Sequence, residues 1–528
     1  MKKNCISLIV LVTVLMTISS YSQQKKVKGT VFLDQNENGL YDKGERGIAN
    51  VALSNGRDVV LTNKNGDYKI KVENDQIVFL IKPSGYIPKL SEDFVQQAYQ
   101  VNKPNGSPNL HFKGAAPTTI QNPLNFPLYK NAGEDTLKIG LIGDTQTKTI
   151  DDVYYLSKVV AEKMMDEEYD FLVPLGDITY DNLRLFEPIK DVLGKVQAPV
   201  YYVYGNHDRN YDGKDLKYRD ETYENSFGPS YYAFNYGSHS FIALNNVFPK
   251  PHHNYEARLD DDQLKFIEGY LSTVPQENDV HLLMHIPLEQ LINLKEFSQL
   301  FKNHPKVHAY AGHTHTQFFE TIKNEDGWSV NAPVEELVAG AVCGSWWHGE
   351  KDIFGIPQAM MSDGTPKGYW VMHLQADEKK YEYKVSEPDN RQMHIWTPFD
   401  FDRELIDFEE RKIVANVYAG NKNTEVQIKI GDGDWLPMNY VEGFDPFYER
   451  LFTLQKNGVT LDQNTLKIGK PRKSYHLWEI PIPKDLESGI HLIQVRASND
   501  YGLDVEGRSM LFNNTNNEQY FIPKKKKK

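Results

Sequence analysis

The sequence predicts an α/β central domain flanked by two all-β domains. From residue 136 onward, strand-like apolar runs alternate with helical stretches, which is the pattern of βαβ units and a largely parallel sheet. The segments on either side contain short strand-like runs separated by turn residues. The length of 528 residues also exceeds that of one ordinary domain.

The composition is that of a folded globular protein and disfavours binding to nucleic acids. Hydrophobic residues make up 40% and charged residues 25% of the chain. The formal net charge is -13, whereas a general nucleic-acid-binding protein normally has a basic face. We therefore expect no nucleic-acid partner, although a bound metal would supply local positive charge.

Residues 1–22 have the pattern of a secretory signal peptide. Two lysines follow Met1, an apolar run spans residues 6–18, and small residues precede the predicted cleavage point. We expect an exported protein, periplasmic or extracellular, with no membrane span after processing, because the apolar run is short. Cys5 lies within the predicted signal peptide, so the mature chain would keep only Cys343 and could form no internal disulfide.

The N-terminal domain is predicted over residues 26–115 as a β-sandwich with a calcium loop. After a strand-like run at 26–33, oxygen-bearing residues follow at the spacing of an EF-hand-type loop, with Gly39 at its sixth position. The predicted calcium ligands are Asp34, Asn36, Asn38, Leu40 (through its carbonyl), Asp42 and Glu45. The flanking segments resemble strands, so an acidic turn without metal remains the alternative. Residues 83–130, rich in Pro, Gly and Asn, are predicted as loops and a linker.

The central domain is predicted over residues 130–385. Its strands are expected at 137–142, 170–175, 200–204, 231–234, 239–244, 280–284, 307–311, 336–340 and 368–374, and its helices at 151–166, 183–193, 260–271 and 288–301.

The last domain is predicted over residues 400–515 as an Ig-like β-sandwich. Its strands are expected at 413–418, 426–430, 476–480 and 491–497, and this part of the chain lacks strong helix signals. The lysine-rich segment 516–528 is predicted as a disordered basic tail.

Polar side chains follow five of the predicted central strands, at the point where each strand ends. The candidate metal ligands are Asp144, Gln146, Asp177, Asn206, His285, His313 and His315. In open α/β sheets such strand ends meet at one edge, so these side chains would converge. Carboxylate, imidazole and amide ligands suit Zn²⁺, Mn²⁺ or iron. Any one of these residues alone would favour a capping or core role, but the ordered series argues against that.

In this order, the motifs Gly-Asp-x-Gln, Gly-Asp, Gly-Asn-His-Asp, His and Gly-His-x-His resemble those of the calcineurin-like metallophosphoesterase superfamily. The resemblance covers about residues 136–385 and implies a four-layer α/β/β/α sandwich with two divalent metals. It implies that Asp144, Asp177 and His315 hold one metal, and that Asp177, Asn206, His285 and His313 hold the other. The domain order is also similar to that of an exported bacterial three-domain subgroup.

The same resemblance implies a reaction and its catalytic residues. His207 would protonate the leaving oxygen and Asp208 would orient His207, while a metal-bound hydroxide attacks phosphorus. The substrate would be a phosphomonoester or a phosphodiester, as a small molecule or a glycan- or lipid-linked ester. A non-catalytic binding or scaffold protein on the same fold is the alternative, as is a structural surface protein, and the oligomeric state is left open.

Two positions depart from the pattern of the family. Gln146 stands where the family has histidine, and a neutral amide oxygen is a poorer ligand, so we expect a weakened first metal site. The family often has an acid or Asn three residues after the Gly-Asp aspartate, where this chain has Tyr180 followed by Asp181.

Five further residues are predicted to touch the substrate. Arg209 and Asn210 follow His207 closely and could bind phosphate, with a solvated loop as the alternative. Trp346, Trp347 and His348 lie on a Gly-rich segment and could form a substrate wall, with core packing as the alternative. The adjacent pair at 252–253, both histidines, is a weaker candidate because neighbouring side chains of a strand face apart.

Overall fold

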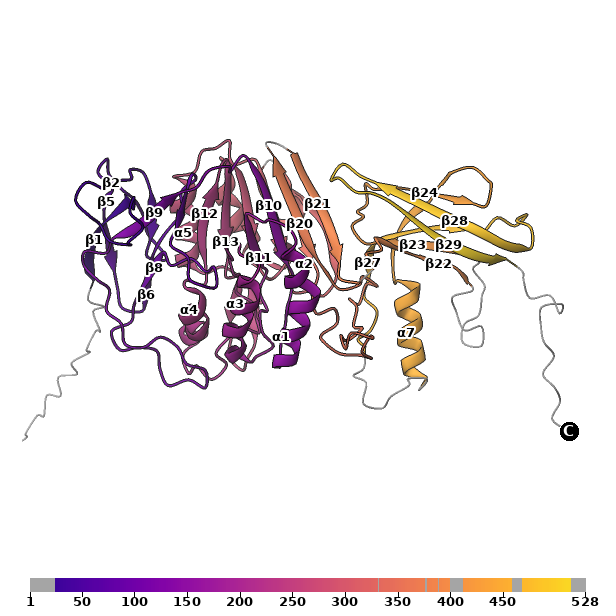
Figure 1. Ribbon diagram of the computed structural model, residues 1–528, viewed down its shortest axis with the longest axis horizontal. Helices are drawn as coiled ribbons and strands as arrows, with labels where there is room; N and C mark the ends of the chain where they lie inside the picture. Colours follow the sequence, from indigo (N-terminus) through magenta and orange to yellow (C-terminus); the bar gives the residue numbers. More distant parts are fainter. Residues whose placement is uncertain are drawn as a thin grey trace, which may run out of the picture.

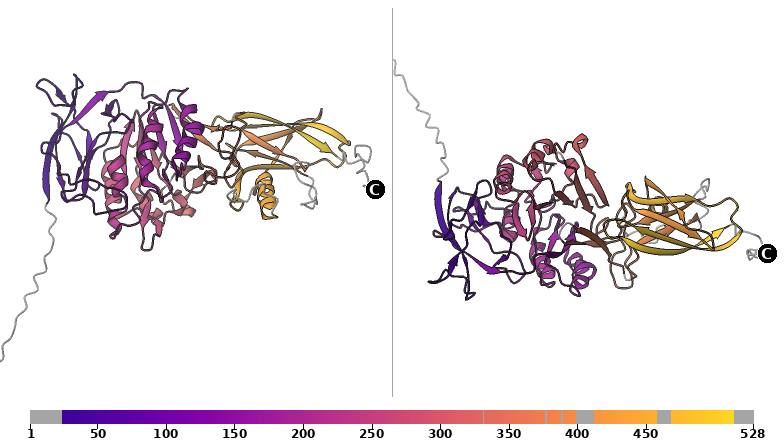
Figure 2. Two further views of the ribbon diagram at one scale, coloured as in Figure 1. Left: turned by 60° about the horizontal axis from the view of Figure 1, so that its bottom comes forward. Right: turned by 90° about the horizontal axis from the view of Figure 1, so that it is seen from above.

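The computed structural model describes residues 24–330, 332–375, 378–387, 389–398, 412–457 and 468–513. Three units follow one another along the long axis, from the indigo N-terminal sheets through the central domain to the yellow C-terminal sheets (Figures 1 and 2). The predicted signal peptide and basic tail lie outside the described residues. Within the described residues, no helix is both long and apolar enough to cross a membrane.

The N-terminal unit consists of two facing sheets. One has the order β2-β1-β9-β7 with β5 also paired to β1, and the other has the order β4-β3-β6-β8. In β5 the buried side chains alternate strictly with exposed ones, as expected for a strand with one face on the core. The strands are β1 (Lys25–Leu33), β2 (Arg46–Gly47), β3 (Ala52–Ser54), β4 (Val59–Leu61), β5 (Asp67–Val72), β6 (Gln76–Leu80), β7 (Tyr86–Pro88), β8 (Tyr99–Asn102) and β9 (Phe126–Lys130).

The segment predicted as a linker contributes three of these strands. β9 pairs in parallel with β1, and β7 pairs with β9, so residues well beyond 115 belong to the same sheets. These strands are short and separated by Pro- and Gly-rich turns. Their partners lie far away in sequence, so local composition does not reveal them.

Two sheets form the middle of the central domain. One has the order β11-β10-β20-β21, and the other has the order β12-β13-β16-β17-β19-β18. The strands are β10 (Thr136–Ile142), β11 (Phe171–Pro174), β12 (Tyr232–Tyr236), β13 (His239–Ala243), β16 (Asp279–Leu283), β17 (Val307–Ala311), β18 (Gln317–Ile322), β19 (Val334–Ala339), β20 (Gly368–Gln375) and β21 (Glu378–Val385), with a hairpin of β14 (Val247–Pro249) and β15 (Tyr255–Ala257) outside the sheets.

Helices cover the outer faces of both sheets, which confirms the predicted four layers. One buried cluster lies between the sheets and includes Ile139, Phe171 and Phe241. A second joins the first sheet to its helices, and a third joins the six-stranded sheet to its own. The helices are α1 (Ile150–Leu156), continued by a π-helical turn η1 (Ser157–Ala161) and α2 (Glu162–Met164), then α3 (Phe186–Gly194), α4 (Glu221–Phe227), α5 (Asp261–Leu271) and α6 (Leu294–Ser298), with 3₁₀ turns η2 (Leu183–Leu185), η3 (Leu216–Tyr218), η4 (Leu288–Gln290), η5 (Gln299–Phe301) and η6 (Asn324–Asp326).

Two predicted central elements differ in the structure. Residues 200–204 are extended and buried beside β11, and Val203 N donates to Pro174 O at 3.0 Å, but they form no continuous strand ladder. The helix predicted at 288–301 is broken into η4, α6 and η5. Asn293 exchanges two hydrogen bonds with the backbone of Leu259, which holds the chain in a loop at the break.

The C-terminal unit is a sandwich of two four-stranded sheets, β22-β23-β27-β26 and β25-β24-β28-β29. It also contains the helix α7 (Pro446–Lys456), which was not predicted. Its start does have a sequence signal, because Asp445 caps the backbone N–H of Tyr448 and Pro446 occupies the first helical position. The strands are β22 (Met393–Trp396), β23 (Lys412–Val417), β24 (Glu425–Ile430), β25 (Leu436–Pro437), β26 (Asn439–Gly443), β27 (Ser474–Pro481), β28 (Gly489–Ser498) and β29 (Asp504–Asn513).

Candidate metal centre

Four of the predicted ligands converge on one point. His285 Nε2 lies 3.1 Å from Asn206 Oδ1, 3.3 Å from Asp177 Oδ1 and 3.1 Å from His313 Nδ1. Asp177, His285 and His313 offer ligand atoms that all lie within 4.8 Å of one another. These residues follow β11, the extended segment 200–204, β16 and β17, which is the arrangement that the sequence predicted.

The remaining predicted ligands lie beside this group. His315 Nε2 is 3.2 Å from Asp144 Oδ2, and Asp144 Oδ1 accepts the backbone N–H of His313 at 2.8 Å. Gln146 Nε2 donates to Asp177 Oδ2 at 2.7 Å. Asp177 therefore contacts both sets with its two oxygens, as a bridging ligand would.

The donor set fits a pair of divalent cations. His285 and His315 each donate their Nδ1 proton to a backbone carbonyl, of Leu175 and Gly344, which leaves Nε2 free to bind a metal. The buried atoms Asp144 Oδ2 and Gln146 Oε1 accept no hydrogen bond in the described structure. Buried oxygens of this kind are costly unless a cation or hydrogen bond satisfies them.

The electrostatics of the cluster also favour a cation. Burial lowers the pKa of His285, but the charge of Asp177 outweighs it and raises that pKa to about 9. The pKa of His313 is lowered to about 4, by burial first and then by the charge of His285. The carboxylates thus attract positive charge to the cluster, and a metal would take the place of the proton on His285.

The backbone is strained at the ligands themselves. Gln146, Asp177, His313 and His315 all have positive φ, at 36°, 48°, 73° and 52°. Residues other than glycine seldom adopt this region, and strained conformations of this kind cluster at functional sites.

His207 is oriented by Asp181, not by Asp208 as predicted. His207 Nδ1 lies 2.8 Å from Asp181 Oδ1, and the ring stacks on Tyr180 with centroids 4.5 Å apart. Burial lowers the pKa of His207, but the bond to Asp181 and the charge of Asp177 outweigh it, so the net shift is upward.

Asp208 has a different role, because its side chain faces the backbone. The buried carboxylate accepts N–H groups of Ile178, Thr179 and Gly205 at 3.0–3.1 Å and so clamps two ligand loops together. The sequence did not predict that Asp181 orients His207. The available signal was that Asp181 is an acid four residues after Asp177, one position later than the acid or Asn of the family pattern.

The predicted substrate contacts are only partly brought to the site. Arg209 is buried, and its donors bind the carbonyls of Asn206, His253 and Asn254 and the Tyr211 hydroxyl. Asn210 is fully buried and bonds Thr222. Both residues therefore stabilise the loop, and the prediction that they bind substrate is not supported.

On the Gly-rich segment, only Trp346 combines exposure with a contact to a predicted ligand. Its side chain is 43% exposed, and its ring lies 5.1 Å from that of His315. Trp347 is buried and donates Nε1–H to Thr145 O at 2.7 Å. His348 is half-buried, and its ring lies 6.3 Å from that of Trp346. His252 and His253 are exposed residues with positive φ in the β14–β15 turn. The sequence did not predict Tyr255 at the site, but its ring centroid lies 6.2 Å from that of His313.

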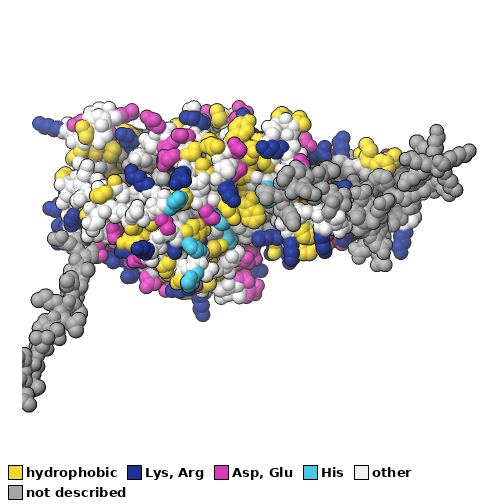
Figure 3. Space-filling view, turned by 90° about the horizontal axis from the view of Figure 1, so that it is seen from below, with side chains coloured by type: hydrophobic (Ala, Val, Ile, Leu, Met, Phe, Trp, Pro, Cys, Tyr) yellow, Lys and Arg dark blue, Asp and Glu magenta, His cyan; other side chains and the backbone are white. Residues whose placement is uncertain are grey.

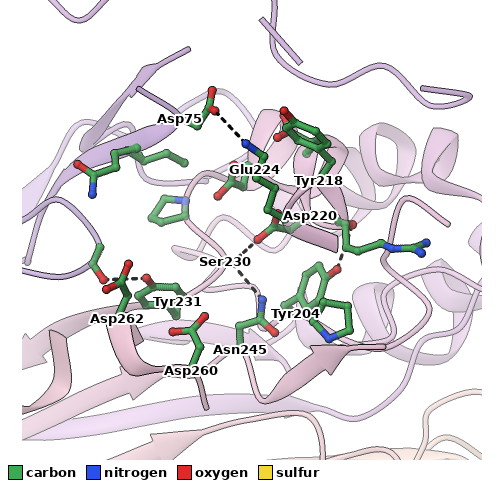
Figure 4. Close-up of a pocket in the computed structure, with 18 of the residues that line it drawn as sticks. Asp75, Tyr204, Tyr218, Asp220, Glu224, Ser230, Tyr231, Asn245, Asp260 and Asp262 are labelled. Carbon is green, nitrogen blue, oxygen red and sulfur yellow. Dashed lines mark hydrogen bonds and ion pairs between the residues drawn. The ribbon is translucent and has the colours of Figure 1, made fainter. Parts of the chain in front are cut away.

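A separate cavity of about 460 Å³ lies between the N-terminal sandwich and the central domain (Figure 4). None of the predicted metal ligands lines it. Lys103 lies within it, 2.6 Å from Glu221 and 3.2 Å from Glu224. Burial, together with the charge of Asp220, raises the pKa of Glu224 to about 8.

The predicted calcium loop folds around its own acids. Asp34 Oδ2 accepts Gly39 N–H at 2.7 Å, as the sharp turn at the sixth position requires. The amides of Asn36 and Asn38 both donate to Asp42 Oδ2, and Glu45 accepts two backbone N–H groups. Asp34 Oδ1 is buried and has no hydrogen-bond partner in the described structure. Leu40 is exposed, and calcium binding stays a prediction.

Family models match along most of the chain. The model described as the N terminal of Calcineurin-like phosphoesterase matches residues 35–116, Calcineurin-like phosphoesterase matches 137–317, and the C terminal of Calcineurin-like phosphoesterase matches 336–504. A 3',5'-cyclic adenosine monophosphate phosphodiesterase CpdA from Vibrio vulnificus is 25% identical over 202 residues, which cover 34% of this chain and 71% of that protein.

Two solved structures show more distant similarity. A dimetal phosphatase from Danio rerio has 14% identity and a TM-score of 0.35, covering 48% of this chain and 96% of the other. The purple acid phosphatase PPD1 from yellow lupin has 13% identity and a TM-score of 0.34, covering 65% and 68%.

Proposed function

Because the chain belongs to the calcineurin-like phosphoesterases, as an enzyme that hydrolyses phosphoric esters, we propose that it acts through two divalent cations with His207 as general acid. The observation that carries the proposal is the convergence of Asp177, Asn206, His285 and His313 on one point, with Asp144 and His315 beside it. The family uses a dinuclear metal centre, and the donor set fits one. Manganese, zinc and iron all suit these ligands.

When bound, the two cations would polarise the phosphoryl oxygens and acidify the attacking water. Asp177 would hold both cations, and its fixed backbone keeps the distance between the two ligand sets constant. His207 donates a proton to the leaving oxygen. Since Asp181 engages its Nδ1, Nε2 is the nitrogen left to carry that proton. The stacked ring of Tyr180 limits rotation of the imidazole.

The similarity to a cyclic-nucleotide phosphodiesterase supports a phosphodiester substrate in particular. We test the proposal by assaying bis(4-nitrophenyl) phosphate and 4-nitrophenyl phosphate with the Mn²⁺-loaded and the metal-stripped protein. Loaded protein should hydrolyse at least one ester, and stripping should abolish turnover. His207→Ala should lower kcat by roughly 10²–10⁴-fold while the metal content stays normal.

A scaffold protein on the same fold is the rival function, because Gln146 stands where the family has an imidazole ligand. Full metal loading without any turnover of either ester would favour it. Full activity of His207→Ala would instead refute the role of that residue while leaving the phosphoesterase function intact.

We also propose that the protein is exported and that its N-terminal loop binds calcium. The basic start and apolar run of residues 1–22 support export, and mass analysis of protein from the native host should show a chain beginning near residue 23. For calcium, the buried and unpartnered Asp34 Oδ1 supports the site. Calcium should raise the Tm of the wild type, and Asp34→Asn should remove that rise.

A further inference from the structure

Building on the proposed function, we propose that the hydrolysed ester carries a long apolar chain, which lies on an exposed hydrophobic surface beside the metal centre. This surface, the apolar rim, consists of Ile150, Tyr154, Trp346, Ile353 and Phe354. The substrate class is thus an amphiphilic phosphate ester.

The apolar rim holds most of the large hydrophobic side chains that the central domain exposes. In the described residues between 130 and 385 seven such side chains are exposed, and only Met165 and Ile292 lie outside the rim. The exposed fractions in the rim are 61% for Ile150, 50% for Tyr154, 43% for Trp346, 93% for Ile353 and 64% for Phe354. Exposed large hydrophobic side chains that gather in one region mark an interaction site, whereas scattered single residues do not.

Two segments far apart in sequence meet to form the rim. Ile150 and Tyr154 are one helical turn apart on α1, so they share a face. The ring of the next residue, Tyr155, lies 5.9 Å from that of Trp347, and Lys351 Nζ lies 5.4 Å from the centre of the Tyr155 ring. These contacts hold the segment 345–357 against α1.

The loop that carries Ile353 and Phe354 is built to present them outward. Asp352 Oδ1 accepts the backbone N–H groups of Phe354 and Ile356, at 2.8 and 2.9 Å. A bridge between Lys351 and Pro357 closes the base of the loop. The exposed side chains therefore sit on a fixed turn.

The rim meets the metal centre at Trp346. Its ring lies 5.1 Å from that of His315, and its backbone has a positive φ of 68°. Seen from below, the central part of the molecule carries both hydrophobic and histidine side chains on this face (Figure 3). A phosphate bound at the ligands would leave its ester chain at Trp346, from where the rim leads away.

The charges around the rim favour a single substrate chain over an anionic membrane. Lys351 and Lys158 are accompanied by Asp352, Asp151 and Glu162, and Lys158 pairs with Glu162. Docking on anionic lipid normally uses a cluster of basic residues without such acids.

The test is a series of 4-nitrophenyl alkyl phosphodiesters with chains of two to ten carbons, each below its critical micelle concentration, on the Mn²⁺-loaded full chain. Each methylene buried on the rim should raise kcat/KM by about two- to fourfold, mainly through KM. A flat series with measurable turnover would overturn the inference and leave the proposed function standing. Turnover of 3',5'-cyclic AMP faster than that of the decyl ester would overturn it as well.

A binding experiment keeps the inference testable if no ester is hydrolysed. The affinity of n-alkyl phosphonates, measured by calorimetry on the metal-loaded protein, should rise with chain length over the same range. Equal affinity for ethyl- and decylphosphonate would overturn the inference, whatever the protein catalyses.

The location is tested by the double variant Ile353→Ser/Phe354→Ser, with Ile292→Ser, also exposed in the same domain, as the matched control. In the double variant, the rise in kcat/KM per methylene should be smaller than in the wild type, and in the control it should be unchanged. Both variants should keep the wild-type Tm. An unchanged gain in the double variant would refute the rim. Sedimentation with neutral phosphatidylcholine vesicles, combined with a flat chain series, would assign the surface to a membrane instead.

Discussion

Among single residues, Asp177 has the largest influence on the geometry of the site. One of its oxygens faces His285 and accepts the backbone N–H of His207, and the other accepts the amide of Gln146. It therefore ties both ligand sets to the loop that carries the general acid. Its positive φ of 48° is explained by these simultaneous demands on one residue.

Gln146 is the weak member of the first ligand set, and replacing it should strengthen metal binding. Gln146→His restores an imidazole at a buried position beside Asp177, and imidazole binds Mn²⁺ and Zn²⁺ better than a neutral amide does. We expect at least one additional metal equivalent, or about tenfold tighter binding, in metal analysis after dialysis against a weak chelator. Unchanged stoichiometry and affinity in the variant would show that position 146 lies outside the coordination sphere.

Asp181→Asn tests the orientation of the general acid. The substitution keeps the size of the side chain but replaces a charge-assisted hydrogen bond to His207 Nδ1 by a neutral one, which is weaker by about 1–2 kcal/mol, or roughly 5–30-fold in rate. We expect kcat to fall in that range with KM and metal content little changed. Asp151→Asn, at an exposed position on α1, is the control and should have full activity.

The ligands were predictable from the sequence, whereas the partners of His207 were not. Asp144, Asp177 and the histidines follow apolar runs directly, so the direction of a strand decides where they lie. The direction of Asp181 and Asp208 depends on loop conformation, including positive φ at Asp181, which no local pattern encodes. The buried state of Arg209 likewise depends on carbonyls of the distant β14–β15 turn.

Among the elements, three strands of the six-stranded sheet carry a buried histidine cluster away from the metal ligands. His239 on β13, His281 on β16 and His308 on β17 lie on neighbouring strands, with ring centroids 5.2 and 5.3 Å apart. His281 lies 3.1 Å from His239 and 3.2 Å from the Tyr310 hydroxyl. Asp279 faces His239 and His308, and Lys379 lies 2.9 Å from His308.

This cluster should make the central domain less stable in mild acid. Burial, and then the charges of the neighbouring histidines and Lys379, hold the pKa of His281 well below its ordinary value, and the pKa values of His239 and His308 are also lowered. The unfolded chain therefore binds more protons, so stability is full above about pH 6.5 and is lost as the pH falls below it. At pH 5.5, His281 alone should lower the free energy of unfolding by about 1.4 kcal/mol relative to its value above pH 6.5.

The measurement is urea unfolding of wild type and His281→Gln at pH 7.5 and pH 5.5. The variant should lose less stability between the two pH values than the wild type, because its side chain takes up no proton. Groups that titrate elsewhere act equally in both proteins, so equal losses would contradict the assignment to His281.

For the molecule as a whole, the C-terminal sandwich directly supports the metal centre. Arg472, just before β27, donates to the carbonyl of Thr314 at 2.5 Å, and Thr314 stands between His313 and His315. Gln317, which follows the same motif, donates its Nε2–H to the backbone carbonyl of Tyr418 at 2.7 Å. Tyr448 of α7 lies 3.4 Å from Ser345, next to Trp346. The sequence predicted a sandwich that serves packing, dimerisation or substrate access and left the choice open, because α7 and these contacts join distant parts of the chain.

Arg472→Ala should therefore weaken metal binding without unfolding the protein. The side chain is exposed, so its loss leaves no cavity, but the strained backbone at His313 and His315 loses one of the bonds that hold it. We expect Mn²⁺ affinity, measured by calorimetry, to fall by about 10-fold, within the range for residues that orient metal ligands. Arg508→Ala, which removes an exposed arginine paired with Glu506 on the same strand, should leave that affinity unchanged. Arg472→Lys can still donate one hydrogen bond and should recover part of the loss. Wild-type affinity in Arg472→Ala would mean that the catalytic domain holds its ligands unaided and that the sandwich serves another purpose.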